Sequence, residues 1–103
     1  MERWAVCTAK VYFEDSPNEF KIRPVIILGD RGFVCESLKV TSQPKNDSRH
    51  IKLSQWQAAG LDKPSWVDIS KTIRIPPEEI MGEIGILDSE DVFNIIKALN
   101  RRA

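Results

Sequence analysis

Two stretches decide how this chain is interpreted: Lys21-Ile22-Arg23-Pro24-Val25-Ile26-Ile27-Leu28, and Leu38-Lys39-Val40-Thr41-Ser42 one hairpin later. Proline cannot donate a hydrogen bond to a sheet ladder, so Pro24 is expected at the start of a strand or at a sheet edge. Arg23 then lies near an open rim, in the extended conformation that a following proline favours. An arginine at the mouth of an apolar strand, beside a strand that ends in Thr-Ser, predicts a small β-barrel with a phosphate site.

The segment between the two stretches predicts an antiparallel hairpin. Gly29-Asp30-Arg31-Gly32 is typical of a tight turn between two strands. In such a hairpin the beginning of one strand pairs with the end of the next, so Arg23 and Thr41 are expected side by side. Two motifs that are distant in sequence would therefore form one site.

Alternating apolar residues predict further strands on both sides of this hairpin. Ala5 to Phe13 alternates with a period of two, which indicates a half-buried strand. A short strand over 49–53 and one helical turn over 55–59, stopped by Gly60, are expected next. A long strand from Trp66 to Ile75 follows, with apolar side chains inward at Val67, Ile69, Ile73 and Ile75.

The C-terminal part predicts a last strand and a helix. Ile80 to Leu87 is expected to be a short strand. Asp88 or Ser89 then caps a helix whose apolar stripe has spacings of three and four, at Val92, Ile95, Ile96 and Leu99. The chain is thus predicted to be mainly β with a C-terminal helix, and residues 1–103 to form one domain.

Composition limits where a nucleic-acid site could lie. The chain has 103 residues, of which 42% are hydrophobic and 29% charged, as in an ordinary globular domain. Lys and Arg together number 15, as do Asp and Glu, so the net charge is zero and an RNA site must be a local patch. No signal peptide or membrane span is apparent, which predicts a cytoplasmic protein. Cys7 and Cys35 are expected to be buried and reduced. Because the chain has a single histidine and no clustered ligands, neither a metal site nor a cofactor is predicted.

The order of these motifs resembles the MazF/PemK (Kid-like) family, the ribonuclease toxins of bacterial type II toxin–antitoxin systems. The resemblance rests on Arg23-Pro24 before an apolar strand, on Thr41-Ser42, on the block Asp68-Ile69-Ser70-Lys71-Thr72-Ile73, and on the helix after Leu87. It implies a small SH3-like twisted barrel of the CcdB/MazF type. Arg23 and Thr41 would be the catalytic residues. The implied RNA-binding residues are Lys39, Ser42, Gln43, Asp68 and Lys71.

The resemblance also implies a function, which is a sequence-selective endoribonuclease. Such an enzyme would cut single-stranded RNA without a metal, act as a homodimer and be neutralised by an antitoxin. The guanidinium fork of Arg23 suits two phosphate oxygens. Because a guanidinium group keeps its proton at any cellular pH, we expect Arg23 to stabilise charge rather than to act as a general base. The alternative for Arg23 is a rim residue paired with Glu14, Asp15 or Glu19.

Two other functions remain open on the sequence. A DNA gyrase poison of the CcdB type has a similar fold, but the end of this chain lacks the tryptophan-bearing motif of that class. A binding module without catalysis is also possible, because Trp66 and Ile69 stand where the family carries arginine and glutamine. Trp66 would then be a base-stacking, interface or core residue. His50 is expected to be an exposed strand residue, and a catalytic role is the less favoured alternative.

Overall fold

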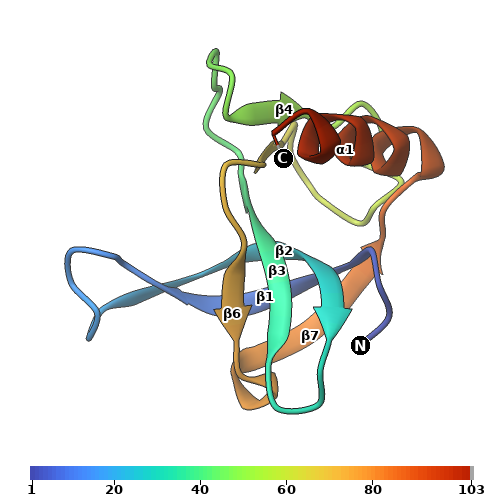
Figure 1. Cartoon of the computed structure of the whole chain (residues 1–103). Coiled ribbons are helices and arrows are strands. Elements are labelled where there is room, and N and C mark those ends of the chain that lie inside the picture. The colour runs from blue at the N-terminus through green and yellow to red at the C-terminus, as the bar shows by residue number, and fades with distance from the viewer. Residues whose placement is uncertain (103) are drawn as a thin grey trace.

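Seven antiparallel strands and one C-terminal helix make up the computed structural model, which describes the backbone of residues 1–102 and the side chains of residues 1–101 (Figure 1). The strands are β1 (Ala5–Tyr12), β2 (Phe20–Asp30), β3 (Cys35–Thr41), β4 (His50–Lys52), β5 (Trp66–Asp68), β6 (Ile73–Ile75) and β7 (Ile80–Ile86). A 3-10 turn, Pro77–Glu79, precedes β7, and the helix α1 is Ser89–Arg102. The predicted mainly β fold with a closing helix is confirmed.

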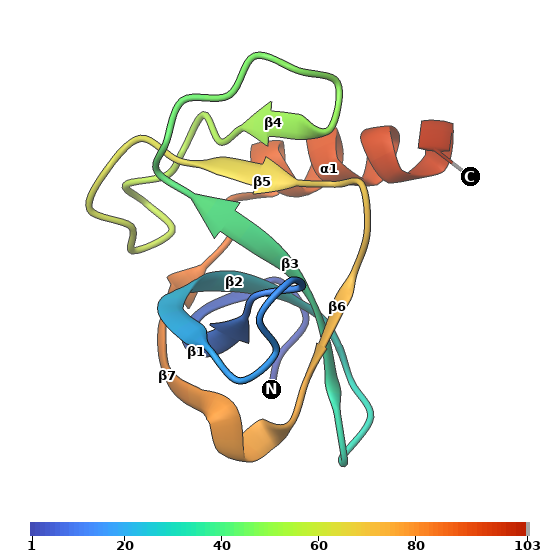
Figure 2. The same cartoon turned by 90° about the vertical axis from the view of Figure 1, so that its left-hand side faces the viewer.

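The strands form one strongly twisted sheet in the order β4-β5-β3-β2-β1-β7, and β6 pairs with β3 beside β5 (Figure 2). Within the described residues no ladder joins the two end strands, β4 and β7, so the sheet curls without closing into a barrel. The predicted hairpin of β2 and β3 is present, with Val25 opposite Lys39 and Ile26 opposite Leu38.

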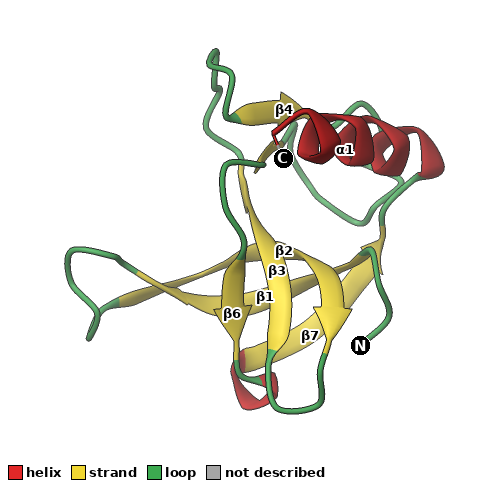
Figure 3. Ribbon diagram, in the orientation of Figure 1, coloured by secondary structure: helices red, strands yellow, loops and turns green. Residues whose placement is uncertain are grey.

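Hydrophobic residues cover both faces of this sheet, because successive side chains of a strand point to opposite sides. On one face, Val6, Ile26 and Leu38 belong to the core that α1 covers (Figure 3). On the other face lies a second cluster, which contains both cysteines. Cys7 and Cys35 are free and buried, as predicted, and burial raises the pKa of Cys7 to about 11.

The helix begins where the sequence predicts. The side chain of Asp88 accepts a hydrogen bond from the backbone N–H of Glu90 at 3.0 Å, which caps the first turn. Ile95 is fully buried, but Ile96, predicted on the same stripe, is 38% exposed. Asp91 and Ala98 occupy the buried face instead. The described helices include none that could serve as a membrane-crossing segment.

Asp91 ties the helix to the loop that precedes β5. Its carboxylate accepts hydrogen bonds from the backbone N–H groups of Ser54 and Gln55, at 2.8 and 2.9 Å. The hydroxyl of Ser54 donates to it as well, at 3.1 Å. The predicted helical turn over 55–59 is a series of turns, and it ends at Gly60, whose φ is +92°.

The single strand predicted from Trp66 to Ile75 is wrong, because the structure divides it into β5 and β6. Both strands pair with β3, but Val40 lies opposite Val67 whereas Ser37 lies opposite Ile73. The register therefore shifts by three residues between them. In the intervening segment, Asp68 accepts hydrogen bonds from the backbone N–H and the hydroxyl of Ser70, at 2.8 and 2.6 Å, and these bonds turn the chain.

Candidate functional site

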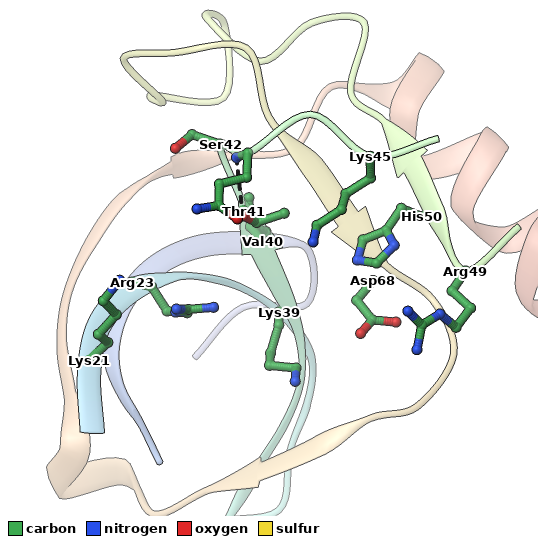
Figure 4. A pocket seen from close by; sticks show the side chains of 11 residues that line it. Lys21, Arg23, Lys39, Val40, Thr41, Ser42, Lys45, Arg49, His50 and Asp68 are labelled. Carbon is green, nitrogen blue, oxygen red and sulfur yellow. Dashed lines mark hydrogen bonds between the residues drawn. The ribbon is translucent and has the colours of Figure 1, made fainter. Parts of the chain in front are cut away.

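A groove of about 500 Å³ lies where the start of β2, the end of β3, the following loop and the β4–β5 ribbon meet (Figure 4). Five basic residues contribute to its lining: Lys21, Arg23, Lys39, Lys45 and Arg49. Thr41, Ser42, Gln43 and His50 are among the polar residues, and Asp68 is the one acidic lining residue among those the structure describes. A chain of zero net charge thus carries a local basic patch.

The β2–β3 ladder accounts for the meeting of Arg23 and Thr41. Its register, with Val25 opposite Lys39, places Arg23 opposite Thr41 when it is continued by two residues. Both residues line the groove. Pro24 is paired with Thr8 of β1, while the β3 ladder begins only at Val25. The proline therefore lies at an edge, inside β2 rather than at its start.

Arg23 extends its guanidinium group into the groove (Figure 4). None of the ion pairs found between described residues involves Arg23. Glu14, one of the acids considered as its partner, contacts the ammonium group of Lys71 instead. The side chain is half-buried, and among the described residues no carboxylate forms an ion pair with its charge. Such an arginine is suited to bind an anion.

Of the predicted RNA-binding residues, Lys39, Ser42, Gln43 and Asp68 line the groove. The hydroxyl of Thr41 accepts a hydrogen bond of 3.2 Å from the backbone N–H of Gln43, which fixes the chain as it leaves β3. Lys71 is not among the described residues that line the groove, because it lies between β5 and β6 and pairs with Glu14.

Asp68 remains ionised in these basic surroundings. Partial burial raises its pKa, but the two hydrogen bonds from Ser70 and the charges of His50 and Lys39 outweigh this effect, so the pKa lies below its ordinary value. In the ribbon Asp68 is paired with His50. A carboxylate among five cations can accept hydrogen bonds from the N–H groups of a nucleobase.

His50 was expected to be exposed, and this expectation is wrong, because only 8% of its side chain is exposed. Its Nδ1 lies 2.8 Å from a carboxylate oxygen of Asp47, within the loop before β4. The hydrogen bond from His50 lowers the pKa of Asp47. Four groove residues were not predicted as site residues, namely Lys21, Lys45, Arg49 and His50. Only Lys21 carries a usable signal, since it lies two residues before Arg23 and hence on the same strand face.

The sequence of the chain matches the model of a known protein family. The model of the family described as PemK-like, MazF-like toxin of type II toxin–antitoxin systems matches residues 2–102. A search among curated protein sequences finds no match to the chain.

Solved structures share the fold. The Mycobacterium tuberculosis toxin MazF-mt6 superposes with a TM-score of 0.75 at 20% identity, over 95% of this chain and 94% of that one. An endoribonuclease in complex with its cognate antitoxin, from a mycobacterial species, gives a TM-score of 0.78 at 11% identity, over 99% and 93% of the two chains. At such identities the likeness concerns the fold, and the chemistry has to be argued from the groove.

Proposed function

This chain belongs to the family of PemK-like, MazF-like toxins of type II toxin–antitoxin systems, and on that premise we propose that it is a sequence-selective, metal-independent endoribonuclease that cleaves single-stranded RNA. The observation that carries the proposal is the meeting of Arg23, free of any ion pair among the described residues, with Thr41 in a basic groove. A groove of this charge attracts a phosphate backbone.

In the proposed reaction the 2′-oxygen of a ribose attacks the adjacent phosphorus and loses its proton to water. The bond from phosphorus to the 5′-oxygen breaks, and that oxygen takes up a proton. The products carry a 2′,3′-cyclic phosphate and a 5′-hydroxyl group. Arg23 stabilises the negative charge that develops on the phosphorane oxygens, and Thr41 positions a phosphate oxygen or the attacking hydroxyl.

The charge of the groove supports a reaction without a metal. Five basic residues face one acid there, and a divalent cation would be repelled where the phosphate is attracted. The guanidinium group of Arg23 supplies at the phosphate the positive charge that a metal supplies in other nucleases.

We expect two partners besides RNA. One fold neighbour was solved in complex with its cognate antitoxin, which supports an antitoxin for this chain. An acidic, disordered antitoxin tail would lie across the groove at Arg23, Thr41 and the loop 43–48, because it would offer carboxylates where RNA offers phosphates. A second copy of the chain is the other expected partner, since large apolar side chains are exposed, among them Phe33 and Met81.

Incubation of the purified protein with mixed single-stranded RNA in EDTA tests the proposal. Discrete cuts with 5′-hydroxyl ends are expected. Loss of cutting on chelation would contradict metal independence, and uniform degradation would contradict sequence selectivity. Binding of RNA without any cut would instead favour a non-catalytic binding module, and inhibition of gyrase without RNA cleavage would favour a gyrase poison.

A further inference from the structure

Trp66 differs from the other two tryptophans of this chain in where it packs. Trp4 and Trp56 are partly buried against the core that α1 covers. Trp66 is equally half-buried, yet among the described residues it belongs to neither hydrophobic cluster. Its indole ring is therefore not explained by core packing.

The sheet register places Trp66 in line with the proposed catalytic pair. Thr41 lies opposite Trp66 in the β3–β5 ladder, and Lys52 lies opposite Trp66 in the β4–β5 ladder. Arg23 falls opposite Thr41 on the other side when the β2–β3 register is continued. Arg23, Thr41, Trp66 and Lys52 thus form a row across four neighbouring strands.

The indole ring lies on the groove side of this row. Residues directly opposite each other in an antiparallel ladder share a face, so Trp66 faces the same way as Thr41. Asp68, two residues further along β5, must point to the same side. Thr41 and Asp68 both line the groove. Trp66 is not among the described residues that line the groove, but the register places its side chain on the same face of the sheet, next to Thr41.

Lys52 places a positive charge next to this ring. Its Nζ lies 5.5 Å from the centre of the Trp66 ring, a cation–π contact. An aromatic face for a base, next to a cation for a phosphate, is the combination by which proteins hold single-stranded nucleic acid.

We propose that Trp66 is a stacking site for the nucleobase next to the phosphate that Arg23 and Thr41 hold, and that Lys52 contacts the following phosphate. The inference rests on the proposed function, and it deepens that function by naming a base-binding subsite. Stacking tolerates every base, so Trp66 contributes affinity and register along the RNA, whereas polar groups such as Asp68 discriminate between bases.

The test combines changes in the RNA with changes in the protein. The probe is a single-stranded RNA that the parent binds, with a 2′-deoxy nucleotide at the cut wherever the parent cuts it, so that it binds without being cleaved. In a second set of probes each base of the bound segment is replaced in turn by an abasic nucleotide. Dissociation constants are measured for the parent, for Trp66→Leu and for Trp66→Phe. Phe93→Leu is the matched control, because Lys97 lies 5.2 Å from the Phe93 ring on the helix, outside the groove.

On intact RNA, Trp66→Leu should weaken binding about 5- to 100-fold, the factor that corresponds to one stacked base. Trp66→Phe should weaken it less, and Phe93→Leu should leave it unchanged. For one abasic position the parent should lose about the same factor, and Trp66→Leu should lose almost nothing further, because the stack is already gone.

Equal losses for the parent and Trp66→Leu at every abasic position would overturn the inference. So would a Trp66→Leu protein that dissociates from dimer to monomer and binds intact and abasic RNA equally poorly, because Trp66 would then be a protein contact. If the parent cuts RNA but the abasic position weakens binding of the parent and of Trp66→Leu equally, only this subsite is refuted. If Trp66→Leu loses almost nothing further at one abasic position but the parent never cuts RNA, only the proposed cleavage is refuted. If the parent binds no RNA, both proposals are refuted.

Discussion

At the scale of single residues, Arg23 combines a permanent charge with a fixed fork of donors, and substitutions separate the two. Arg23→Lys keeps the charge but loses the bidentate geometry, so we expect the cleavage rate to fall by about 10²-fold or more, as when one preorganised oxyanion donor is removed. Arg23→Ala should be at least as slow, and Thr41→Val should lose less. Single-turnover cleavage measures these rates, and the melting temperature is the control, since the side chain is half-exposed at a rim. If both arginine variants cut like the parent, Arg23 has no catalytic role.

A second prediction at this scale concerns Asp47, whose pKa the hydrogen bond from His50 lowers. A carboxyl group with a depressed pKa in the folded state stabilises the fold above its unfolded pKa, near 4, and this contribution is lost as the pH falls through the folded pKa. Asp47→Asn should therefore be less stable than the parent at neutral pH and lose less stability on acidification. Asp30 and Asp68, whose pKa values are also lowered, contribute acid sensitivity of the same sign.

Urea unfolding of both proteins from neutral pH down to about pH 3 measures the difference. Identical loss of stability on acidification would show that the Asp47–His50 contact contributes nothing to the fold.

The predictable part of the site follows strand register, and the rest follows loop conformation. Arg23 and Thr41 could be placed together because a hairpin fixes which residues face each other. His50 could not, because its burial depends on Asp47 and on the course of the loop 43–49, which has no sequence periodicity. The position of Lys71 could not be predicted for a similar reason, since its contact with Glu14 depends on the turn after Asp68.

At the scale of elements, β7 and the turn that ends at Gly60 touch through their backbones. A Cβ atom on Gly85 would lie 2.2 Å from the carbonyl oxygen of Ala59, whereas a Cβ on Gly82 of the same strand would meet nothing within 4 Å. Gly85→Ala should therefore destabilise the fold by about 1–3 kcal/mol or more, because neither backbone can move freely. Gly82→Ala should be neutral or slightly stabilising, since alanine reduces the entropy of the unfolded chain. Thermal unfolding compares the two, and equal effects would refute the close contact.

Hydrophobic alternation predicted one strand across β5 and β6. Its one interruption is Lys71, which lies in the segment between the two strands. Val67 and Ile69 pack in the core that α1 covers, whereas Ile75 belongs to the second cluster. The three-residue shift in register coincides with hydrogen bonds from Ser70 to Asp68, which the alternation does not reveal. In the helix, likewise, the pattern identified Ile95 but not the buried carboxylate of Asp91, which is explained by donors from a distant loop.

At the scale of the whole molecule, zero net charge and a basic groove together predict how RNA binding depends on salt. The overall charge provides no long-range attraction, so the salt dependence must come from cations that touch phosphates. For single strands the logarithm of the binding constant falls with the logarithm of salt concentration by about 0.7 for each phosphate neutralised. Lys45→Ala should therefore reduce this slope by about 0.7. Lys97→Ala removes a lysine on the helix, outside the groove, and should leave the slope unchanged. Binding of an uncleaved 2′-deoxy-substituted RNA at several salt concentrations measures both slopes. If the two variants change the slope equally, RNA responds to the total charge and the groove does not bind its backbone.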